Sequence, residues 1–193
     1  MVNNFKIYKN FNLSEKDKGA IILIGNFDGL HRGHQKLFNK AKNFKKKFKL
    51  KIGVITFDPI PKMFFKKLSN YRLSNFDQKI QLLKKNNVDF IVNQKFNLKF
   101  SKISCLDFIK KILFKKIKPK YIFVSDNFRF GYKRVGDLKL LKSLEKDYDY
   151  KIINPSPLKS KKFVISSTLI RKNLETGNLK KVKKFLGRNW CIE

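Results

Sequence analysis

Short apolar runs alternate along this chain with stretches in which apolar residues recur every three or four positions. Such runs are typical of buried strands in a parallel sheet, and the periodic stretches are typical of amphipathic helices. The predicted strands are Ala20–Gly25, Lys51–Phe57, Asp89–Val92, Tyr121–Val124, Tyr150–Ile153 and Phe163–Ile165. The predicted helices are one that begins at Gly33 or His34, followed by Asn75–Lys85, Cys105–Lys116, Asp137–Tyr148, Ser167–Thr176 and Asn178–Leu186. Strands that alternate with helices over the whole length predict an α/β domain with a doubly wound, mostly parallel sheet.

Proline, glycine and asparagine mark several element ends. Pro59 and Pro61 are expected to close the second strand, because proline cannot donate a hydrogen bond inside a sheet. Gly177 is expected to end one helix, and Asn178 to cap the start of the next. In a doubly wound sheet, ligands bind beyond the carboxyl ends of the strands, so the polar loops that follow the strands form the candidate site.

The composition is that of a globular chain. Of the 193 residues, 42% are hydrophobic and 20 are Phe, which excludes a disordered protein. Two cysteines cannot form a disulfide framework, and no Cys/His cluster suggests structural zinc. The opening residues MVNNFKIYKN contain no apolar signal-peptide core, and the run AIILIGNF is too short to cross a bilayer. We therefore expect a soluble, cytoplasmic protein that does not associate with a membrane.

The net charge is strongly positive. Lys and Arg number 46 against 14 Asp and Glu, for a formal net charge of +32. Such a field attracts polyanions, nucleic acid among them. The excess is almost entirely lysine, however, and Lys, Asn, Ile and Phe share A/T-rich codons, so a biased genome would produce the same composition. Nucleic-acid binding is therefore an alternative function rather than the main expectation.

The loop between the first strand and the first helix carries the clearest candidate chemistry. Gly25–His34 places glycines where a strand ends and a helix opens, which brings the backbone and unpaired N–H groups toward an anion such as phosphate. His31 and His34 are the two histidines of the chain and can face one bound group, as hydrogen-bond donors or as shared charge. A metal pair is an alternative, but only Asp28 is near enough to add a ligand. A purely structural turn is the other alternative.

Hydroxyl and guanidinium groups gather near the start of a later helix. Ser166, Ser167 and Thr168 can cap that helix or hydrogen-bond a phosphate. Arg171 points the same way one helical turn later, and its fork suits bidentate phosphate binding. Arginine is scarce in this lysine-rich chain, which favours a functional role for Arg171 and Arg129 over a surface salt bridge.

A third loop follows the predicted strand Tyr121–Val124. Asn127 and Phe128 in this loop could contact a planar heterocycle or a phosphate. Packing of Phe128 or Phe130 into the core is an equal alternative.

Four motifs, taken together, carry a family resemblance. Gly25–Gln35, with the sequence GNFDGLHRGHQ, resembles the HxGH signature of the nucleotidylyltransferase superfamily, and more specifically the adenylyltransferase module of the bacterial bifunctional riboflavin kinase/FMN adenylyltransferases. Thr56–Pro61, Asp126–Gly131 and Ser166–Arg171 resemble further segments of that module, in the same order. The resemblance extends from about Gly19 to Arg188.

This resemblance implies a Rossmann-like nucleotidylyltransferase fold over residues 1–188, followed by a short tail, 189–193, without a riboflavin kinase module. It implies transfer of AMP from ATP to the phosphate of FMN, which yields FAD and pyrophosphate, with Mg²⁺ accompanying ATP. Positioning and electrostatic stabilisation would carry this reaction without a covalent enzyme intermediate. A separate riboflavin kinase could supply FMN.

The resemblance also implies roles for individual residues. The catalytic group is His31, His34, Asn127 and Arg171. The ATP-binding group is Gly25, Asn26, Phe27, Asp28, Gly29, Gly33, Ser166, Ser167 and Thr168, of which Ser167 and Thr168 would hold the β- and γ-phosphates with Arg171. The FMN-binding group is Asp58, Pro59, Pro61, Asn127, Phe128 and Arg129. No protein ligand for a metal is expected.

Two positions depart from the family pattern. Ile60 stands where the family commonly has His, and Ser125 where it usually has Gly. The first departure keeps an inactive, flavin-nucleotide-binding copy as an alternative. Another HxGH enzyme with a different acceptor, such as pantetheine-phosphate adenylyltransferase, is the enzymatic alternative.

Overall fold

Six parallel strands form the central sheet of the computed structural model, which describes residues 5–191. The strand order is β1-β4-β3-β2-β5-β8. The bounds of these strands are β1 Lys6–Tyr8, β2 Ile21–Ile24, β3 Ile52–Asp58, β4 Phe90–Lys95, β5 Tyr121–Phe123 and β8 Lys151–Ile153. Every neighbouring pair is parallel, so all six carboxyl ends lie at one edge of the sheet. The chain builds outward from β2 to β3, and then returns to the other side of β2 to add β5. The gap between β2 and β5 is thus the topological switch point at which such sheets bind ligands.

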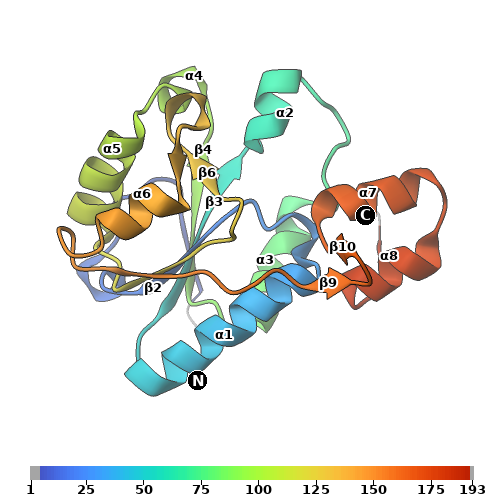
Figure 1. Cartoon of the computed structure of the whole chain (residues 1–193), viewed down its shortest axis with the longest axis horizontal. Helices are drawn as coiled ribbons and strands as arrows, with labels where there is room; N and C mark the ends of the chain where they lie inside the picture. The colour runs from blue at the N-terminus through green and yellow to red at the C-terminus, as the bar shows by residue number, and fades with distance from the viewer. Residues whose placement is uncertain (1–4, 192–193) are drawn as a thin grey trace.

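Helices cover both faces of the sheet (Figure 1). The longer ones are α1 Arg32–Phe48, α3 Phe76–Lys85, the π-helix η3 Phe108–Ile117 that continues α5 Cys105–Asp107, α6 Leu138–Ser143, α7 Ser167–Glu175 and α8 Leu179–Leu186. Shorter elements are η1 Glu15–Asp17, η2 Asp28–Leu30, α2 Pro61–Lys66, α4 Leu98–Ser101 and η4 Tyr132–Arg134. Two small hairpins pair β6 Arg129–Phe130 with β7 Gly136–Asp137, and β9 Lys159–Ser160 with β10 Phe163–Val164.

The alternation of side chains along β2 divides the core into two halves. Ile21 and Leu23 pack with α1 and α3, whereas Ile22 and Ile24 pack with η3 and α6 on the opposite face. All four residues are almost fully buried, as expected for a central strand of a doubly wound sheet. The predicted fold class is therefore confirmed.

A third, smaller hydrophobic cluster lies under α7 and α8, which Figure 1 shows side by side at the end of the molecule away from α5 and α6. Its buried members are Leu73, Ile165, Ile170, Val182, Phe185 and Leu186. The cluster therefore attaches the last two helices to the segment that precedes α3. Trp190, in the segment expected to be a tail, also packs here and donates a hydrogen bond from Nε1 to the Leu73 carbonyl oxygen at 2.9 Å. The last two residues of that segment, 192–193, lie outside the described residues.

Most predicted elements are found within one or two residues of their expected bounds, and two predictions are wrong in part. The helix predicted over Asp137–Tyr148 ends at Ser143. The chain then turns back, so that the Tyr150 hydroxyl donates to the Leu141 carbonyl oxygen at 2.8 Å. The strand predicted at Phe163–Ile165 forms only the two-residue β10, which pairs with β9 and not with the central sheet. Strand β1 and helices α2 and α4 were not predicted, because each is too short to show a period.

Helix ends agree with the predicted signals. The Asn178 side chain accepts a hydrogen bond from the Lys181 N–H at 3.2 Å and so caps α8. Gly177 follows α7 with a φ of +66°, which glycine adopts without strain. Within residues 5–191, no helix is long and apolar enough to span a membrane.

Close packing over one glycine leads to a stability prediction. In Gly53→Ala, the added methyl would lie 2.2 Å from Cζ of Phe90 and 2.8 Å from Cδ1 of Ile22, both fully buried. Overpacking of this kind costs about 1–3 kcal/mol, so the free energy of unfolding measured in urea should fall by that amount. The control Lys46→Ala, on the exposed side of α1, should change it by less than about 0.5 kcal/mol. Equal stability of the two variants would contradict the close approach of β3 to Phe90.

Candidate active site

The loop after β2 folds into a tight, buried turn. Asp28, Gly29 and Leu30 form η2, and all three are buried. Gly29 has a φ of +73°, and a Cβ there would lie 2.9 Å from the Leu73 Cβ, so both the backbone conformation and the space require glycine. Phe27 also adopts a left-handed conformation, with φ +46°, and its ring is buried beneath the loop. The loop is therefore a fixed platform at the carboxyl end of β2.

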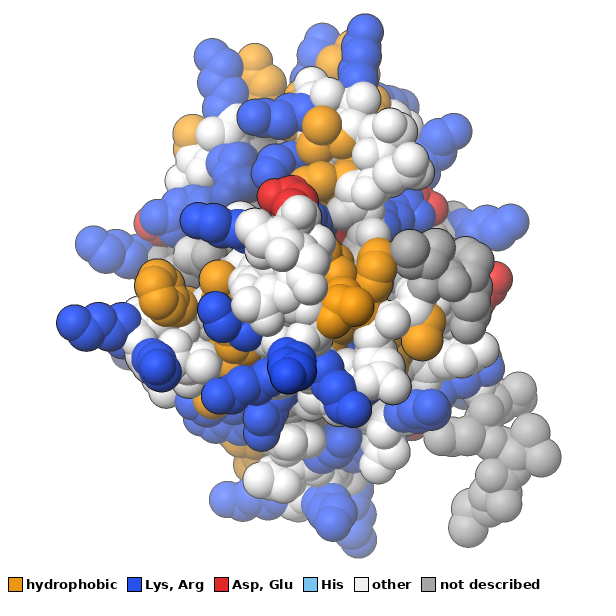
Figure 2. All heavy atoms as spheres, turned by 90° about the vertical axis from the view of Figure 1, so that its right-hand side faces the viewer, with side chains coloured by type: hydrophobic (Ala, Val, Ile, Leu, Met, Phe, Trp, Pro, Cys, Tyr) orange, Lys and Arg blue, Asp and Glu red, His pale blue; other side chains and the backbone are white. Residues whose placement is uncertain are grey.

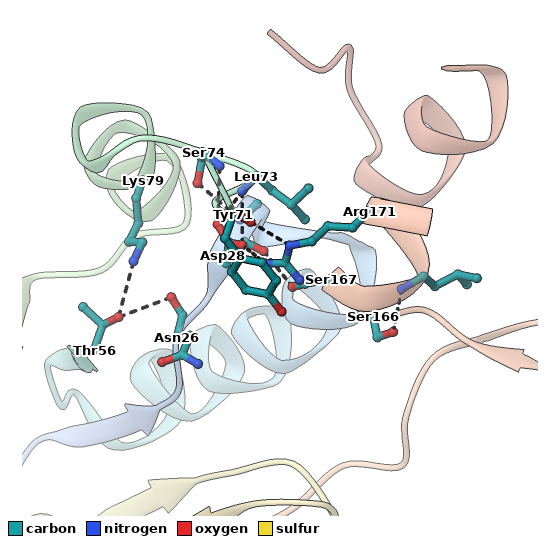
Figure 3. A network of polar contacts seen from close by, with 12 residues as sticks. Asn26, Asp28, Thr56, Tyr71, Leu73, Ser74, Lys79, Ser166, Ser167 and Arg171 are labelled. Carbon is teal, nitrogen blue, oxygen red and sulfur yellow. Dashed lines mark hydrogen bonds and ion pairs between the residues drawn. The ribbon is translucent and has the colours of Figure 1, made fainter. Parts of the chain in front are cut away.

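The Asp28 carboxylate joins three distant segments at this platform (Figure 3). Its Oδ1 accepts hydrogen bonds from the N–H groups of Leu73 at 2.9 Å and Ser74 at 3.4 Å. Its Oδ2 forms an ion pair with the Arg171 guanidinium of α7. The Ser167 hydroxyl donates to the Asp28 carbonyl oxygen at 3.0 Å, which fixes α7 a second time. Burial raises the pKa of the Asp28 carboxyl, and the Arg171 charge and the backbone N–H groups oppose that rise.

Arg171 is held from several directions. Besides the pair with Asp28, its Nε donates to the Tyr71 carbonyl oxygen at 2.7 Å, and its guanidinium lies 3.7 Å from the centroid of the Tyr71 ring. Its side chain is 14% exposed. The ion pair is therefore buried, unlike the surface salt bridge that was one alternative for this residue.

The two histidines are stacked at the start of α1. Their ring centroids lie 3.7 Å apart with an interplanar angle of 20°. His31 caps the helix, because its Nδ1 accepts a hydrogen bond from the His34 N–H at 3.3 Å. The Phe27 ring packs edge-on against His34 at 5.2 Å. At Gly33, a Cβ would lie 3.0 Å from the Ile165 carbonyl oxygen and 3.1 Å from the His31 ring, so this position has little room for a larger residue.

Both imidazoles are neutral at physiological pH. Burial lowers the pKa of His31 to about 4, and the positive charges of Arg171 and Arg188 contribute. Burial also holds the pKa of His34 well below its ordinary value, together with the charges of His31 and Lys79. Of the two roles considered for these residues, the electrostatics therefore favour hydrogen-bond donors over shared charge.

Three basic residues that the sequence did not single out also line this region. Lys79, on α3, is 5% exposed, and its Nζ donates to the Thr56 hydroxyl at 3.4 Å. Arg72 pairs with Asp58 at the end of β3. Arg188, just after α8, donates to the Gly29 carbonyl oxygen at 2.9 Å.

Unpartnered polar atoms concentrate around the same loop. Buried side-chain polar atoms nearly always have a hydrogen-bond partner. In the part of the chain that the structure describes, four lack one: His34 Nδ1, Arg72 Nε, Asn93 Oδ1 and Arg188 Nη1. Each belongs to a segment that meets the carboxyl ends of β2, β3 or β4. Their concentration there is typical of a binding site for a polar ligand.

The remaining predicted residues are less directly connected to this centre. Ser166 caps α7, accepting from the Leu169 N–H at 3.2 Å, and Thr168 is exposed on the same helix. Asp58 and Pro59 follow the buried part of β3, whereas Pro61 begins α2 after the buried Ile60.

In the described part of the chain, the residues of the loop after β5 form hydrogen bonds with one another and not with the histidines. Asn127 is exposed, and its Oδ1 accepts from the Ser125 hydroxyl at 2.8 Å. Phe128 stacks on Phe130 at 5.4 Å and packs against the core, as one alternative held. Arg129 is exposed and donates to its neighbour's carbonyl oxygen. No hydrogen bond joins these residues to His31, His34 or Arg171 among residues 5–191.

Comparison with known proteins identifies the family to which this chain belongs. The family model for FAD synthetase matches residues 13–169. The chain belongs to the FAD synthetase family. This membership agrees with the resemblance carried by the four motifs and selects it over the pantetheine-phosphate adenylyltransferase alternative.

Related proteins carry corresponding names. The chain is 40% identical over 182 residues to a bifunctional riboflavin kinase/FMN adenylyltransferase of Buchnera aphidicola. The aligned region covers 94% of this chain and 58% of that protein. It is 32% identical to the protein of that name from Escherichia coli K12, with coverages of 94% and 58%. A FAD synthetase of Listeria monocytogenes is 29% identical over 93% of this chain and 73% of its own length. The chain thus spans a little over half the length of its bifunctional relatives.

Solved structures support the fold. A crystal structure described as a macrolide-efflux protein from Streptococcus pneumoniae superposes with a TM-score of 0.82 and 26% identity, over 96% of this chain and 62% of that one. A pantoate-beta-alanine ligase from Francisella tularensis superposes with a TM-score of 0.54 and 22% identity, over 95% and 79% of the two chains. The latter likeness concerns the fold alone, and it agrees with a Rossmann-like nucleotidylyltransferase fold for this FAD synthetase family member.

The buried Asp28–Arg171 pair leads to a second stability prediction. Asp28→Asn would leave the Arg171 guanidinium buried without its counter-charge, and removing one partner of a buried pair costs about 3–5 kcal/mol. The free energy of unfolding in urea should fall by that amount. Asp107→Asn, which removes the exposed partner of Lys111, is the control and should cost less than about 0.5 kcal/mol. A similar small loss in both variants would show that Arg171 does not depend on Asp28.

The low pKa values of the histidines lead to a third prediction. Because the chain has two histidines, both imidazole Hε1 signals can be followed by NMR. Neither should titrate between pH 8 and 6, and the His31 midpoint should lie near pH 4. An unfolded histidine has a pKa near 6.5, so the unfolded state takes up protons first, and the free energy of unfolding should decrease as the pH falls from about 6.5 toward 4. A midpoint near pH 6.5 for either residue would contradict their burial as neutral groups.

Proposed function

We propose that this chain transfers AMP from ATP to the phosphate of FMN, which produces FAD and pyrophosphate. Membership of the FAD synthetase family supports the reaction class. The observation that carries the proposal is the stacked pair of neutral imidazoles at the N-terminus of α1, with His34 Nδ1 buried and unpartnered. Such an arrangement suits an oxyanion that approaches the opening turn of the helix.

The chemistry needs no nucleophile from the protein. An oxygen of the FMN phosphate attacks the α-phosphorus of ATP, the new P–O bond forms, and the bond to the bridging oxygen breaks as pyrophosphate leaves. Charge grows on the bridging and non-bridging oxygens, and fixed hydrogen-bond donors stabilise it. His31 and His34 would donate these hydrogen bonds without losing a proton.

The helix itself adds to this stabilisation. Helix α1 is 17 residues long and has no acidic residue in its first turn, so no acidic side chain of the helix itself offsets the positive end of its dipole. Arg171, Ser167 and Thr168 would hold the departing phosphates at the start of α7. Asn127 would orient the FMN phosphate, and Asp58, Pro59 and Pro61 would border the flavin.

Mg²⁺ would reach the site with ATP and would neutralise part of the phosphate charge. Among residues 5–191, no three His, Cys, Asp or Glu side chains gather closely enough to hold a metal ion. The proposed roles of the side chains therefore do not depend on a metal ligand from the protein. The other substrate is phosphorylated riboflavin, which a riboflavin kinase activity must supply. A cytoplasmic location would place the protein with both substrates.

The nucleic-acid alternative has surface charge as its support. Figure 2 shows many Lys and Arg side chains, interspersed with neutral and apolar ones, on the face it presents. In α8, four of the eight residues are exposed lysines, and basic residues along one helix are a feature of nucleic-acid readers. The stacked imidazoles have no part in that function, and they favour phosphate transfer.

A direct assay tests the proposal. The purified chain, incubated with ATP, Mg²⁺ and FMN, should form FAD and pyrophosphate, measured by chromatography and by phosphate release. Riboflavin and phosphopantetheine serve as control acceptors and should give no product. No FAD above the enzyme-free blank would refute the function.

A variant at His34 tests the mechanism. Because loss of one oxyanion donor costs about 10²–10³-fold in kcat, His34→Ala should lower kcat by at least 10²-fold. Lys46→Ala, on the exposed side of the same helix, should leave kcat unchanged. A change confined to KM would show that His34 binds the ground state and contributes nothing specific to the transition state.

A further inference from the structure

A buried lysine lies beside the active-site loop without an adequate partner. Lys79 is on α3 and is 5% exposed, yet its ammonium makes one long hydrogen bond, 3.4 Å to the Thr56 hydroxyl. An ammonium group has three N–H donors, so most of the hydrogen-bonding capacity of Lys79 is unused. Burying a charge that lacks hydrogen-bond acceptors costs free energy, unless a ligand or a counter-ion supplies those acceptors.

The nearby carboxylates do not supply that counter-ion. Asp28 and Asp58 both lie close enough to influence the pKa of Lys79. Asp28 is paired with Arg171, however, and Asp58 with Arg72. Neither carboxylate comes within 4.0 Å of the Lys79 Nζ in the part of the chain described by the structure. Ion pairing therefore does not explain the position of this lysine.

The direction of the side chain places its charge at the candidate active site. Figure 3 shows Lys79 extending from α3 toward Thr56 and Asn26. The Thr56 hydroxyl in turn donates to the Asn26 carbonyl oxygen at 3.2 Å. Asn26 begins the loop that leads to the two histidines, and the charge of Lys79 is near enough to help lower the pKa of His34. The ammonium thus lies under the loop in which the substrate phosphates are expected.

We propose that Lys79 is a substrate-binding residue whose ammonium donates a hydrogen bond to a phosphate oxygen of a bound reactant. This inference rests on the proposed function, since that function brings phosphates to the loop after β2. Both ATP and FMN carry such a phosphate, and the experiment below distinguishes them. Burial lowers the pKa of Lys79 to about 8, so the group is mostly charged at pH 7 and able to bind an anion.

A substrate-binding role and a structural role predict opposite signs for stability. If the role of Lys79 is to bind a phosphate, its charge is unsatisfied in the ligand-free chain. Replacing it with an apolar residue of similar length then removes this buried charge, so the ligand-free chain should be equally stable or more stable. If Lys79 supports the fold, the same replacement should destabilise the chain. Ligand affinity should fall only in the first case.

The test compares Lys79→Met with the control Lys85→Met, an exposed position on the same helix. The melting temperature of each full-length variant is measured without ligand, and the Kd values for ATP, FMN and inorganic pyrophosphate are measured by calorimetry. We expect Lys79→Met to melt at or above the wild-type temperature and to bind one of these ligands at least about tenfold more weakly, as for the loss of a charge-assisted hydrogen bond. Lys85→Met should change neither quantity.

The pattern of lost affinity identifies the phosphate. Weaker binding of ATP and pyrophosphate assigns Lys79 to the leaving group, weaker binding of ATP alone assigns it to the α-phosphate, and weaker binding of FMN assigns it to the acceptor. Lys79→Gln, which keeps a hydrogen-bond donor but loses the charge, should bind the same ligand more weakly than the wild type does.

Some outcomes overturn the inference. These are unchanged Kd values for all three ligands in both variants, or a Lys79→Met chain that melts lower or fails to fold while Lys79→Gln binds as wild type does. The proposed function is judged separately by FAD formation in the wild-type chain. An inactive wild type that still loses phosphate affinity in Lys79→Met would refute the function and retain the lysine's role.

Discussion

The ion pair between Asp28 and Arg171 is the interaction on which the active-site region depends. It joins the loop after β2 to a helix 143 residues later in the chain, and the same carboxylate fixes the backbone that precedes α3. Burying two charges costs free energy that their attraction offsets only when the remaining hydrogen-bond positions are filled. Here the Leu73, Ser74 and Tyr71 backbones fill them. The pair therefore helps to specify one arrangement of these three segments, together with the small apolar cluster and the hydrogen bonds of Ser167 and Arg188 to the loop.

That arrangement sets the electrostatics of the histidines. Burial is the main reason why protonation of either ring is unfavourable, and the positive charges of Arg171 and Arg188 near His31, and of Lys79 near His34, add to it. In the proposed function, a polyphosphate that enters the region would meet neutral hydrogen-bond donors surrounded by cations. The cations would attract the ligand and the imidazoles would supply directional hydrogen bonds, so different residues would carry out the two tasks.

The sequence predicts most of the fold and part of the site. Buried strands of the sheet are continuous apolar runs, so Ala20–Gly25 and Tyr121–Val124 could be recognised without any tertiary information. The glycine loop with its two histidines could be recognised for a similar reason, because local spacing determines it. By contrast, the partner of Asp28 could not be inferred, since nothing local connects it with Arg171. The positions of Asn127 and Thr168 relative to the histidines depend in the same way on how separate loops meet.

Lys79 is the instructive omission. It lies three residues after Phe76 and four before Leu83, on the apolar stripe of its helix, and a lysine at such a position is itself a signal. Because this chain is so rich in lysine, a lysine at an apolar position is easily attributed to composition alone. The π-helix η3 and the early end of α6 had no comparable signal, because tertiary packing and not periodicity decides where those helices change or stop.

The attachment of α7 and α8 to the loop after β2 has a consequence for how the protein is made. A ribosome that adds about 5–20 residues per second delivers Arg171 several seconds or more after Asp28 has been synthesised. During that interval the aspartate lacks its guanidinium, and Gly29 lacks the contact with Arg188. The growing chain can assemble its central strands from the amino end onward, but the contacts that hold the loop after β2 form only once α7, α8 and Arg188 have been synthesised.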